Sequence, residues 1–514
     1  MKASERRIAV NTILLSGTEL LSRVVSLFLV ILVARRLGPQ MMGIYAFALT
    51  FVSLFETCIN FGLERFIQRE VGRRRELAGP LYATIFQLKF LVFLISIGLI
   101  VIFSLTVVDG AIKRWVVTIL GFSLFFRTNV ASGNAFFRAC QKAGYEALVV
   151  MSFRLVYGCV GLAAVLSGQG LITLVTLELV AQGGACCLSW WLFVKKIAKP
   201  MQLSCTIFGF RCLPHSSPLD TNTGSADEES RTTSWSRLLE LTRAAKDFLL
   251  IRIVLTAFMS ANMLMLPALA GDAATGYYSA ALRLTSAFDF LPDAFTGAFL
   301  PVMSQCATRG LPAFLETFRQ YFKYLLMAGL VLAALLGGLA DGFIMVVFGA
   351  AFKPAILTLI LLALILVLDF TNLTFSNALI ALNQERKNLR IFGVAVLANI
   401  LLNLALISSY QQNGAVMASL VCEVTVLLLQ LQALGWDRTV RLELAATAAR
   451  PVMACLLGFL LGRVMMAWQV SPFAAFVVMP PALLLLLLVT KALSLKELKA
   501  MVSLIPFRQE PVEP

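Results

Sequence analysis

Charged residues are scarce in this chain. Asp, Glu, Lys and Arg together make up 14% of its 514 residues, whereas hydrophobic residues make up 59% and the mean hydropathy is +0.85. A soluble globular domain carries about 25% charged residues. A chain this apolar would aggregate in water, so lipid must be its solvent. The composition predicts an all-α membrane protein that crosses the bilayer many times and has no large soluble domain.

Side chains for catalysis and metal binding are also scarce. The sequence has one histidine, His215, in a polar stretch, and it contains neither a CxxC pair nor a GxxxxGK[ST] loop. Its ten cysteines are scattered, mostly within apolar segments, where they serve as small apolar side chains. These absences argue against a zinc site, a disulfide framework and ATP hydrolysis. We therefore expect a protein that is not an enzyme and that has no metal or cofactor.

Hydrophobic segments fill almost the whole chain. Most are long enough to cross a bilayer, which takes about 20 apolar residues. The segment at 274–305 is too long for one straight helix and contains Pro292 and Pro301, so we expect a bend there. Fourteen segments are predicted, at approximately 8–34, 41–64, 81–107, 115–138, 147–167, 171–194, 243–269, 274–305, 321–345, 355–382, 389–408, 414–434, 444–467 and 471–490.

The first six segments recur as the next six. Residues 38–45 (GPQMMGIY) align with residues 271–278 (GDAATGYY) at an offset of 233, and seven of the nineteen positions from Gly38 to Glu56 are identical. Glu56 falls on Asp289, so an intramembrane acid is duplicated. Because six is an even number, the two units enter the membrane with the same polarity, as in parallel transporter repeats. We predict a six-helix bundle at 1–195, a cytoplasmic linker at 196–242, a second bundle at 243–434, and two further helices with a tail at 435–514.

The distribution of basic residues predicts the orientation. Lys and Arg gather in the connections on one face, most densely in the segment after residue 64, and in the C-terminal tail. Basic residues in short loops mark the cytoplasmic side, so both termini are predicted to be cytoplasmic. The net charge of +15 is then a consequence of topology and no sign of nucleic-acid binding.

Polar residues form stripes within five of the apolar segments. A spacing of three or four residues places each set on one helix face, and ionisable groups at membrane depth normally face an interior or a wet cavity. We interpret the stripes as the lining of a central hydrophilic cavity between the bundles; the alternative is structural pairing, for example of Glu19 with Arg23. The stripes comprise Thr12, Ser16, Glu19, Arg23 and Ser26; Ser53, Glu56, Asn60 and Glu64; Arg252, Thr256 and Ser260; Ser279, Arg283, Ser286, Asp289 and Asp293; and Asp369, Asn372 and Ser376.

Five further charges stand alone in their segments. Lys89 and Arg154 lie nearer to span ends, from which long side chains can reach the membrane surface. Arg127 lies near mid-depth and is harder to explain in that way. Glu178 and Glu423 are candidates to bind protons or sodium, or to pair with a neighbouring arginine.

Two stretches resemble a known family. Residues 37–48 (LGPQMMGIYAFA) resemble the LGPxxYGxYxxA signature of bacterial oligosaccharide flippases of polysaccharide export, with Met42 in place of the first Tyr. Residues 61–73 (FGLERFIQREVGR) resemble the FGLxxxLxREIAR segment of the same proteins. This family lies within the superfamily that includes the multidrug and toxin extrusion transporters. The resemblance covers the first two segments most clearly and the seventh and eighth moderately.

The resemblance implies a substrate: an oligosaccharide on undecaprenyl pyrophosphate, moved between leaflets of the bacterial inner membrane for surface polysaccharide synthesis. Its partners would be membrane lipids, a polysaccharide polymerase and chain-length proteins, with no nucleic acid. Guanidinium groups match phosphate oxygens, which makes arginines the candidate substrate contacts.

Three other functions remain open: a cation-coupled exporter of small amphipathic molecules, a lipid II flippase and a membrane scaffold. The candidate site residues are Arg23, Arg252, Arg283 and Arg127 for the substrate, and Glu56, Asp289, Asp369 and Glu19 as coupling or cavity acids.

Overall fold

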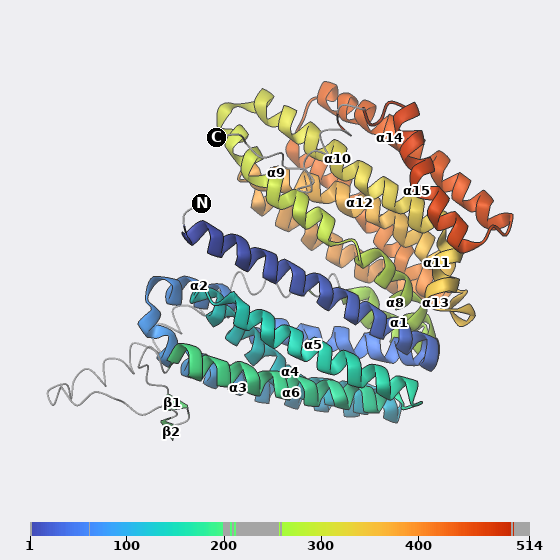
Figure 1. The fold of residues 1–514 in the computed structure, drawn as a ribbon. Helices are drawn as coiled ribbons and strands as arrows, with labels where there is room; N and C mark the ends of the chain where they lie inside the picture. Colours follow the sequence, from blue (N-terminus) through green and yellow to red (C-terminus); the bar gives the residue numbers. More distant parts are fainter. Residues whose placement is uncertain are drawn as a thin grey trace. The chain divides into compact units, whose positions relative to one another are not determined.

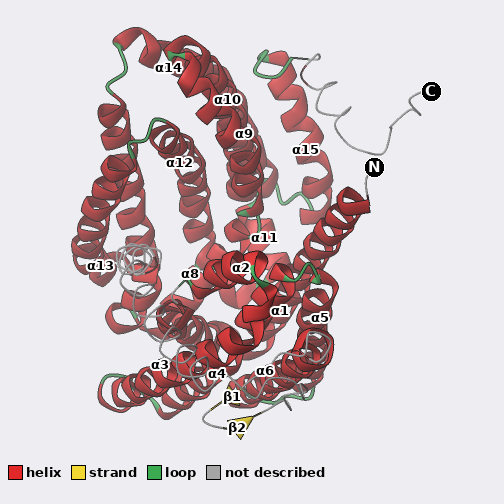
Figure 2. Cartoon of the chain, turned by 90° about the vertical axis from the view of Figure 1, so that its left-hand side faces the viewer, coloured by secondary structure: helices red, strands yellow, loops and turns green. Residues whose placement is uncertain are grey.

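The computed structural model describes residues 3–60, 62–198, 206–207, 210–211, 256, 260–494 and 497, with side chains from residue 25 onward. The chain separates into two compact units, Met1–Leu264 and Met265–Pro514, which we call the N-terminal and C-terminal units and describe separately. Figure 1 shows the helices of each unit in sequence colours, and Figure 2 shows that helix dominates the described chain.

The N-terminal unit is a helical bundle with one small hairpin of two-residue strands. Helix α4 contacts α1, α3 and α6, and α5 packs between α1 and α6. The elements are α1 (Ala3–Asn60), α2 (Leu63–Arg73), the 3-10 turn η1 (Arg75–Leu77), α3 (Ala78–Thr106), α4 (Ala111–Ala139), α5 (Ala143–Leu166), α6 (Leu171–Phe193), the π-helical turn η2 (Val194–Ala198), β1 (Thr206–Ile207) and β2 (Phe210–Arg211).

The C-terminal unit is built around α10 and α12, which pack against each other and against α13, α14, α8 and α9. The helices α10 and α14 approach closely because glycines face each other there: a Cβ on Gly462 would lie 3.0 Å from the backbone of Gly338. The elements are α8 (Gly271–Ser286), α9 (Phe290–Arg309), α10 (Leu311–Gly338), α11 (Ala340–Val347), the 3-10 turn η3 (Ala350–Phe352), α12 (Ala355–Ala381), α13 (Glu385–Leu434), α14 (Arg438–Ala467) and α15 (Pro472–Val489).

The predicted fold class is confirmed. Within the described residues, ten helices are long and apolar enough to cross a membrane, so this is a multi-pass membrane protein. Two of the ten are long enough for two crossings, and both are interrupted: α1 at Gly38 and α13 at Gln411. Both interruptions fall between segments that the hydropathy pattern separates. The bend expected in 274–305 occurs between Ser286 and Phe290, where α8 ends and α9 begins.

The internal repeat has a structural counterpart at its two aligned glycines. Gly38 has φ of 79° and Gly271 has φ of 84°, a region that favours glycine because a Cβ is strained there. A short apolar helix, Ser260–Leu269, precedes Gly271 and α8 follows it, as the two parts of α1 flank Gly38. The relation of the two bundles by an axis along the membrane normal stays a prediction, as do the domain boundaries. Most of the expected linker lies outside the described residues.

The structure corrects two predicted segments. Residues 321–345 do not form one helix, because α10 ends at Gly338 and α11 begins at Ala340. We placed Glu64 on the second membrane helix, but α1 ends at Asn60 and Glu64 begins the separate helix α2. In α2 the apolar residues Leu63, Ile67 and Val71 are buried, whereas its basic residues lie on other faces. A short helix with one apolar and one basic face is typical of the membrane surface.

Replacing Gly38 by alanine should destabilise the protein through its backbone alone. With φ of 79° and ψ of 178°, Gly38 occupies a region that is nearly exclusive to glycine, and an added Cβ would meet no neighbour within 4 Å. We expect Gly38→Ala to cost about 1–3 kcal/mol, measured by thermal unfolding in detergent. The control is Gly98→Ala in α3, where a Cβ also has open space but φ is not positive. Equal melting temperatures for the two variants would contradict the strain argument.

Candidate functional site

The second half of α1 directs two polar side chains toward the neighbouring helices of its own unit. Glu56 Oε2 lies 3.0 Å from Nη1 of Arg127, which is near the middle of α4. One turn further along α1, Asn60 Oδ1 accepts a hydrogen bond of 2.9 Å from Lys89 of α3. The spacing of four residues puts both groups on one face, as the sequence predicted. The structure shows what that face meets: cations of α3 and α4.

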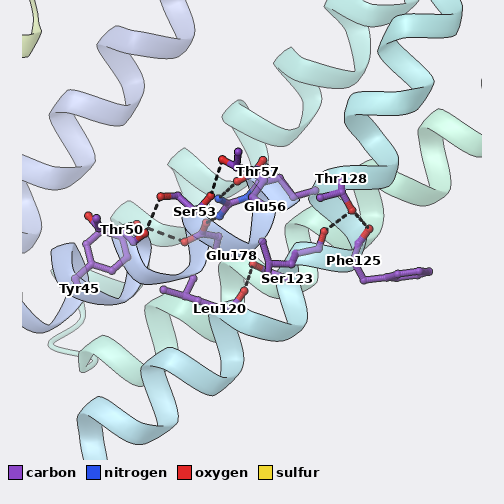
Figure 3. Close-up of polar contacts among 12 residues, drawn as sticks. Tyr45, Thr50, Ser53, Glu56, Thr57, Leu120, Ser123, Phe125, Thr128 and Glu178 are labelled. Atoms are coloured by element: carbon purple, nitrogen blue, oxygen red, sulfur yellow. Dashed lines mark hydrogen bonds and ion pairs between the residues drawn. The ribbon is translucent and has the colours of Figure 1, made fainter. Parts of the chain in front are cut away.

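Arg127 bridges two acids. Its Nη2 lies 3.2 Å from Glu178 Oε1 on α6, so one guanidinium joins α1, α4 and α6. The other oxygen of Glu178 accepts hydrogen bonds of 3.4 Å from the hydroxyls of Tyr45 and Tyr157. We call Tyr45, Glu56, Arg127, Tyr157 and Glu178 the N-terminal cluster; Figure 3 shows Tyr45, Glu56 and Glu178 converging within the bundle. Glu178 is 9% exposed and Arg127 is 26% exposed.

Lys89 adds a second buried cation beside this cluster. Its side chain is fully buried, and its Nζ donates to Asn60 and, at 2.6 Å, to the carbonyl of Thr128. The expectation that Lys89 reaches the membrane surface is therefore wrong. Glu56 thus has two cations nearby, Arg127 and Lys89, and Lys89 also interacts with the charge of Glu64. Buried charges are tolerable only with such nearby opposite charges.

Arg154 lies in the middle of α5, close to the N-terminal cluster. Its guanidinium carbon is 5.4 Å from the ring centroid of Phe153, a cation–π contact. Its Nε is buried and has no hydrogen-bond partner among the described side chains and backbone. A position in mid-helix does not favour the interface contact that we expected from the sequence.

The C-terminal unit holds a second group of ionisable residues, which we call the acidic cluster: Asp289, Asp369 and Glu423. Asn372 donates to the carboxylate of Glu423 at 2.6 Å and to its carbonyl at 2.9 Å, which joins α12 to α13. The carboxyl groups of Asp369 and Glu423 lie close to each other, and Asp289 is near enough to Asp369 to interact electrostatically.

The acidic cluster is accessible. Asp369 and Asp289 are exposed and Glu423 is partly exposed, although Asp369 lies in the middle of α12. Among the described residues, neither Asp369 nor Glu423 forms an ion pair with a basic side chain, and Asp289 makes a further interaction. Acids at such a depth normally face water or an ion path. The described residues contain no group of three or more His, Cys, Asp or Glu arranged to hold a metal ion.

The four arginines that we predicted to bind the substrate differ in their surroundings. Arg127 is paired with two carboxylates. Arg283, in α8, is partly exposed and makes no ion pair or side-chain hydrogen bond within the described residues. Arg252, and the side chains of Arg23 and Glu19, lie outside the described part of the chain, so their placement stays a prediction.

Sequence reasoning missed the aromatic members of the N-terminal cluster. Tyr45 lies in the family-like stretch, but nothing in its spacing distinguishes it from a packing tyrosine. Tyr157 and Lys89 form hydrogen bonds with residues of other helices. Tyr157 is 21 residues from Glu178, and Lys89 is 29 residues from Asn60. The only usable signal was the scarcity of polar residues in these segments, which singled out Arg127, Glu178 and Glu423.

Comparisons with known proteins relate the chain to membrane transporters. The family model described as polysaccharide biosynthesis protein matches residues 8–307. The structure of the lipid II flippase MurJ in an inward closed conformation is similar, with 14% identity and a TM-score of 0.66 over 95% of this chain and 100% of that chain. An inward-facing MATE family multidrug resistance transporter of the MOP superfamily has 15% identity and a TM-score of 0.61 over 85% and 98% of the two chains. At such identities the likeness shows a shared fold. By sequence, no curated protein matches.

Removing Arg127 should destabilise the N-terminal unit. Arg127→Leu leaves Glu56 and Glu178 facing each other without their shared cation, which typically costs about 3–5 kcal/mol for a buried pair. We expect the triple variant Arg127→Leu, Glu56→Gln and Glu178→Gln to recover most of the lost melting temperature, measured in the same detergent.

The matched control for this prediction is Arg450→Leu in α14, because Arg450 is exposed and has no ion pair among the described residues. If Arg127→Leu melts like wild type, or if the triple variant is less stable than the single one, the bridge does not stabilise the bundle as argued.

Proposed function

The chain belongs to the polysaccharide biosynthesis protein family, and we propose that it is a flippase for an undecaprenyl-pyrophosphate-linked oligosaccharide. It would move this lipid from the inner to the outer leaflet of the bacterial inner membrane, for the assembly of O antigen, capsule or exopolysaccharide. Both termini would be cytoplasmic, and the polymerase and chain-length proteins would act on the product. The fold shared with flippases and multidrug transporters supports transport over catalysis.

Arg283 is the observation that carries this proposal. It stands 12 residues into α8 from Gly271, which is about 18 Å along the helix. An arginine at such depth needs an anion or water, because a charge in hydrocarbon is costly. Arg127 obtains its anions from Glu56 and Glu178, whereas Arg283 has no carboxylate partner within the described residues. A pyrophosphate would supply the missing negative charge.

The chemistry of the substrate fits such a site. A guanidinium binds phosphate oxygens through paired hydrogen bonds, and Arg23 and Arg252 are proposed to assist Arg283. Arg127 would contact the substrate only if the pyrophosphate replaced one of its two carboxylates. The polar glycan would travel through the wet interior, while the lipid tail would stay in the bilayer. Alternating access of the two units is proposed as the mechanism.

The membrane potential assists this direction of movement. A negative charge that moves outward across an inside-negative membrane gains about 2.3 kcal/mol per charge for each 100 mV. The pyrophosphate therefore contributes to the driving force itself. Coupling to a cation gradient would then add to the driving force for transport, but transport would not require it.

The acidic cluster supports a second candidate function, a cation-coupled exporter of small amphipathic molecules. Asp369 is exposed and lies close to the partly exposed Glu423, an arrangement that suits the exchange of protons or sodium. The same pair is compatible with a flippase that uses an ion gradient in addition to the potential. Lipid II is a third possible cargo, since its carrier pyrophosphate would be recognised by the same arginine.

Neutralising Arg283 should reduce glycan export. We expect Arg283→Ala to lower surface polysaccharide at least tenfold in a flippase-null strain at matched protein levels, because an anion in a site of low dielectric needs its counter-charge. Arg283→Lys should be intermediate, since lysine keeps the charge but loses the paired geometry. The control is Arg36→Ala, an exposed arginine next to the Gly38 turn. Wild-type export by Arg283→Ala would remove Arg283 from the substrate site.

Neutralising Asp369 tests whether an ion gradient contributes. In proteoliposomes, we expect Asp369→Asn to abolish any acceleration of transport by a proton or sodium gradient, while transport driven by the potential alone persists. The reason is that Asp369 is the exposed member of the carboxyl pair with Glu423, where a cation would be bound and released. Asp437→Asn, at an exposed acid between α13 and α14, is the control. A variant that still responds to the gradient as wild type does would exclude this pair as the coupling site.

A further inference from the structure

A groove of about 440 Å³ lies between α5 and α6 of the N-terminal unit and shares Tyr157 with the N-terminal cluster. Most of its lining is apolar, and only Ser152 and Tyr157 carry polar side-chain atoms. Both hydroxyls are already used: Ser152 donates to the carbonyl of Leu148 and Tyr157 donates to Glu178. The groove therefore offers mostly apolar surface, which suits an apolar occupant.

The groove opens outward. Val156 and Val180 on its edges are 54% and 66% exposed. On α6 its depth comes from small residues, Ala181 and Gly184, and a Cβ on Gly184 would meet nothing within 4 Å. In a helix that crosses the bilayer, such an opening faces hydrocarbon, so a lipid chain is available to fill it.

One end of the groove leads to aromatic and basic side chains. The α6 residues Leu177, Ala181, Gly184 and Leu188 recur every three or four positions, and the same stripe continues to Trp191 and Lys195. Trp191 is 52% exposed, and Lys195 Nζ lies 4.6 Å from its ring centroid. Along the helix, Lys195 is about 10 Å beyond Leu188. Tryptophan and lysine in this order are typical of the region where headgroups meet acyl chains.

The α5 wall of the groove also leads to an aromatic and a basic side chain. Lys196 Nζ lies 5.8 Å from the ring centroid of Tyr145 on α5. Lys142 Nζ donates to the carbonyl of Lys196, which offsets the partial negative charge of this helix end. Lys195 and Lys196 belong to a π-helical turn, and neither forms an ion pair with another described residue. Three lysines thus lie at the adjoining ends of the two helices that wall the groove, the start of α5 and the turn after α6.

We propose that this groove binds one anionic phospholipid of the surrounding membrane. An acyl chain lies along α5 and α6, and the phosphate of the headgroup is held by Lys195 and Lys196. The occupant also contacts the ring of Tyr157, whose hydroxyl bonds Glu178, so the lipid supports the N-terminal cluster from outside.

The charges favour a lipid over a second copy of the chain. Small residues on α6 would suit helix packing, but a parallel symmetric contact along this stripe would bring the lysines of two copies together. An anionic headgroup instead neutralises them, at about 1 kcal/mol per basic residue near a charged surface.

The test is the thermal stability of the purified full-length protein in detergent, with phosphatidylglycerol or phosphatidylcholine of identical acyl chains added. We expect phosphatidylglycerol to raise the melting temperature of wild type more than phosphatidylcholine does, and native mass spectrometry to retain one such lipid. Lys195→Gln with Lys196→Gln should weaken apparent binding of phosphatidylglycerol at least fivefold. Gly184→Leu, which fills the groove, should abolish the retained lipid.

Two controls separate this site from general effects. Gly98→Leu places the same side chain at another exposed helical glycine with open space, in α3, and Lys353→Gln removes an exposed charge from the C-terminal unit. Neither should change lipid binding. Equal responses to the two lipids would show bulk solvation only and overturn the proposal. The proposal would also be overturned if Gly184→Leu retained the lipid as wild type does. The same holds if Gly184→Leu dissociated a dimer without changing lipid retention.

Discussion

The low tolerance of a bilayer for uncompensated charge is the constraint on which this structure depends. The N-terminal unit satisfies it with the bridge from Arg127 to Glu56 and Glu178, which ties three helices together within the membrane-spanning bundle. Two tyrosine hydroxyls complete the hydrogen bonding of Glu178. Because each partner alone would be costly, the bridge fixes how α1, α4 and α6 are rotated about their axes.

The two units meet this constraint in different ways. Charges of the N-terminal cluster are paired and mostly enclosed, whereas the C-terminal unit keeps Arg283 without a carboxylate partner in the described chain and holds Asp369 accessible beside Glu423. Such groups are stable in a membrane protein when water, ions or a substrate reach them. This difference between the units suggests that the N-terminal cluster is a rigid frame. The C-terminal unit then holds more of the charged groups that can bind and release ions or substrate.

The sequence was sufficient to predict helix positions, because hydropathy alone separates the spans and glycine marks the turns at 38 and 271. It also identified Arg127, Glu178 and Glu423 as unusual, since few charges occur at these depths. It did not reveal their partners: a spacing of four residues assigns Glu56 to a helix face but does not say which helix that face meets. Lys89 illustrates the limit, because its enclosure depends on Asn60 and a carbonyl of α4 that are distant in sequence.

The break in α13 shows a similar limit. Gln411 adopts φ of 52°, although neither glycine nor proline occupies that position. Hydropathy separates the segments on either side but does not identify the exposed Gln411 as the residue that turns the chain. The backbone comes close to itself at Gly414 instead, where a Cβ would clash with the carbonyl oxygen of Leu406.

Transport by the purified protein is the most direct test of the proposed function. Proteoliposomes would receive an undecaprenyl-pyrophosphate oligosaccharide with a label that a membrane-impermeant enzyme removes from the outer leaflet only. The account predicts that wild-type protein renders nearly all of the labelled pool accessible, faster when the potential drives negative charge toward the enzyme. If only the outer half of the pool is ever cleaved, while the same vesicles transport small amphipathic cations against a gradient, the protein is an exporter of small molecules and the flippase proposal is wrong.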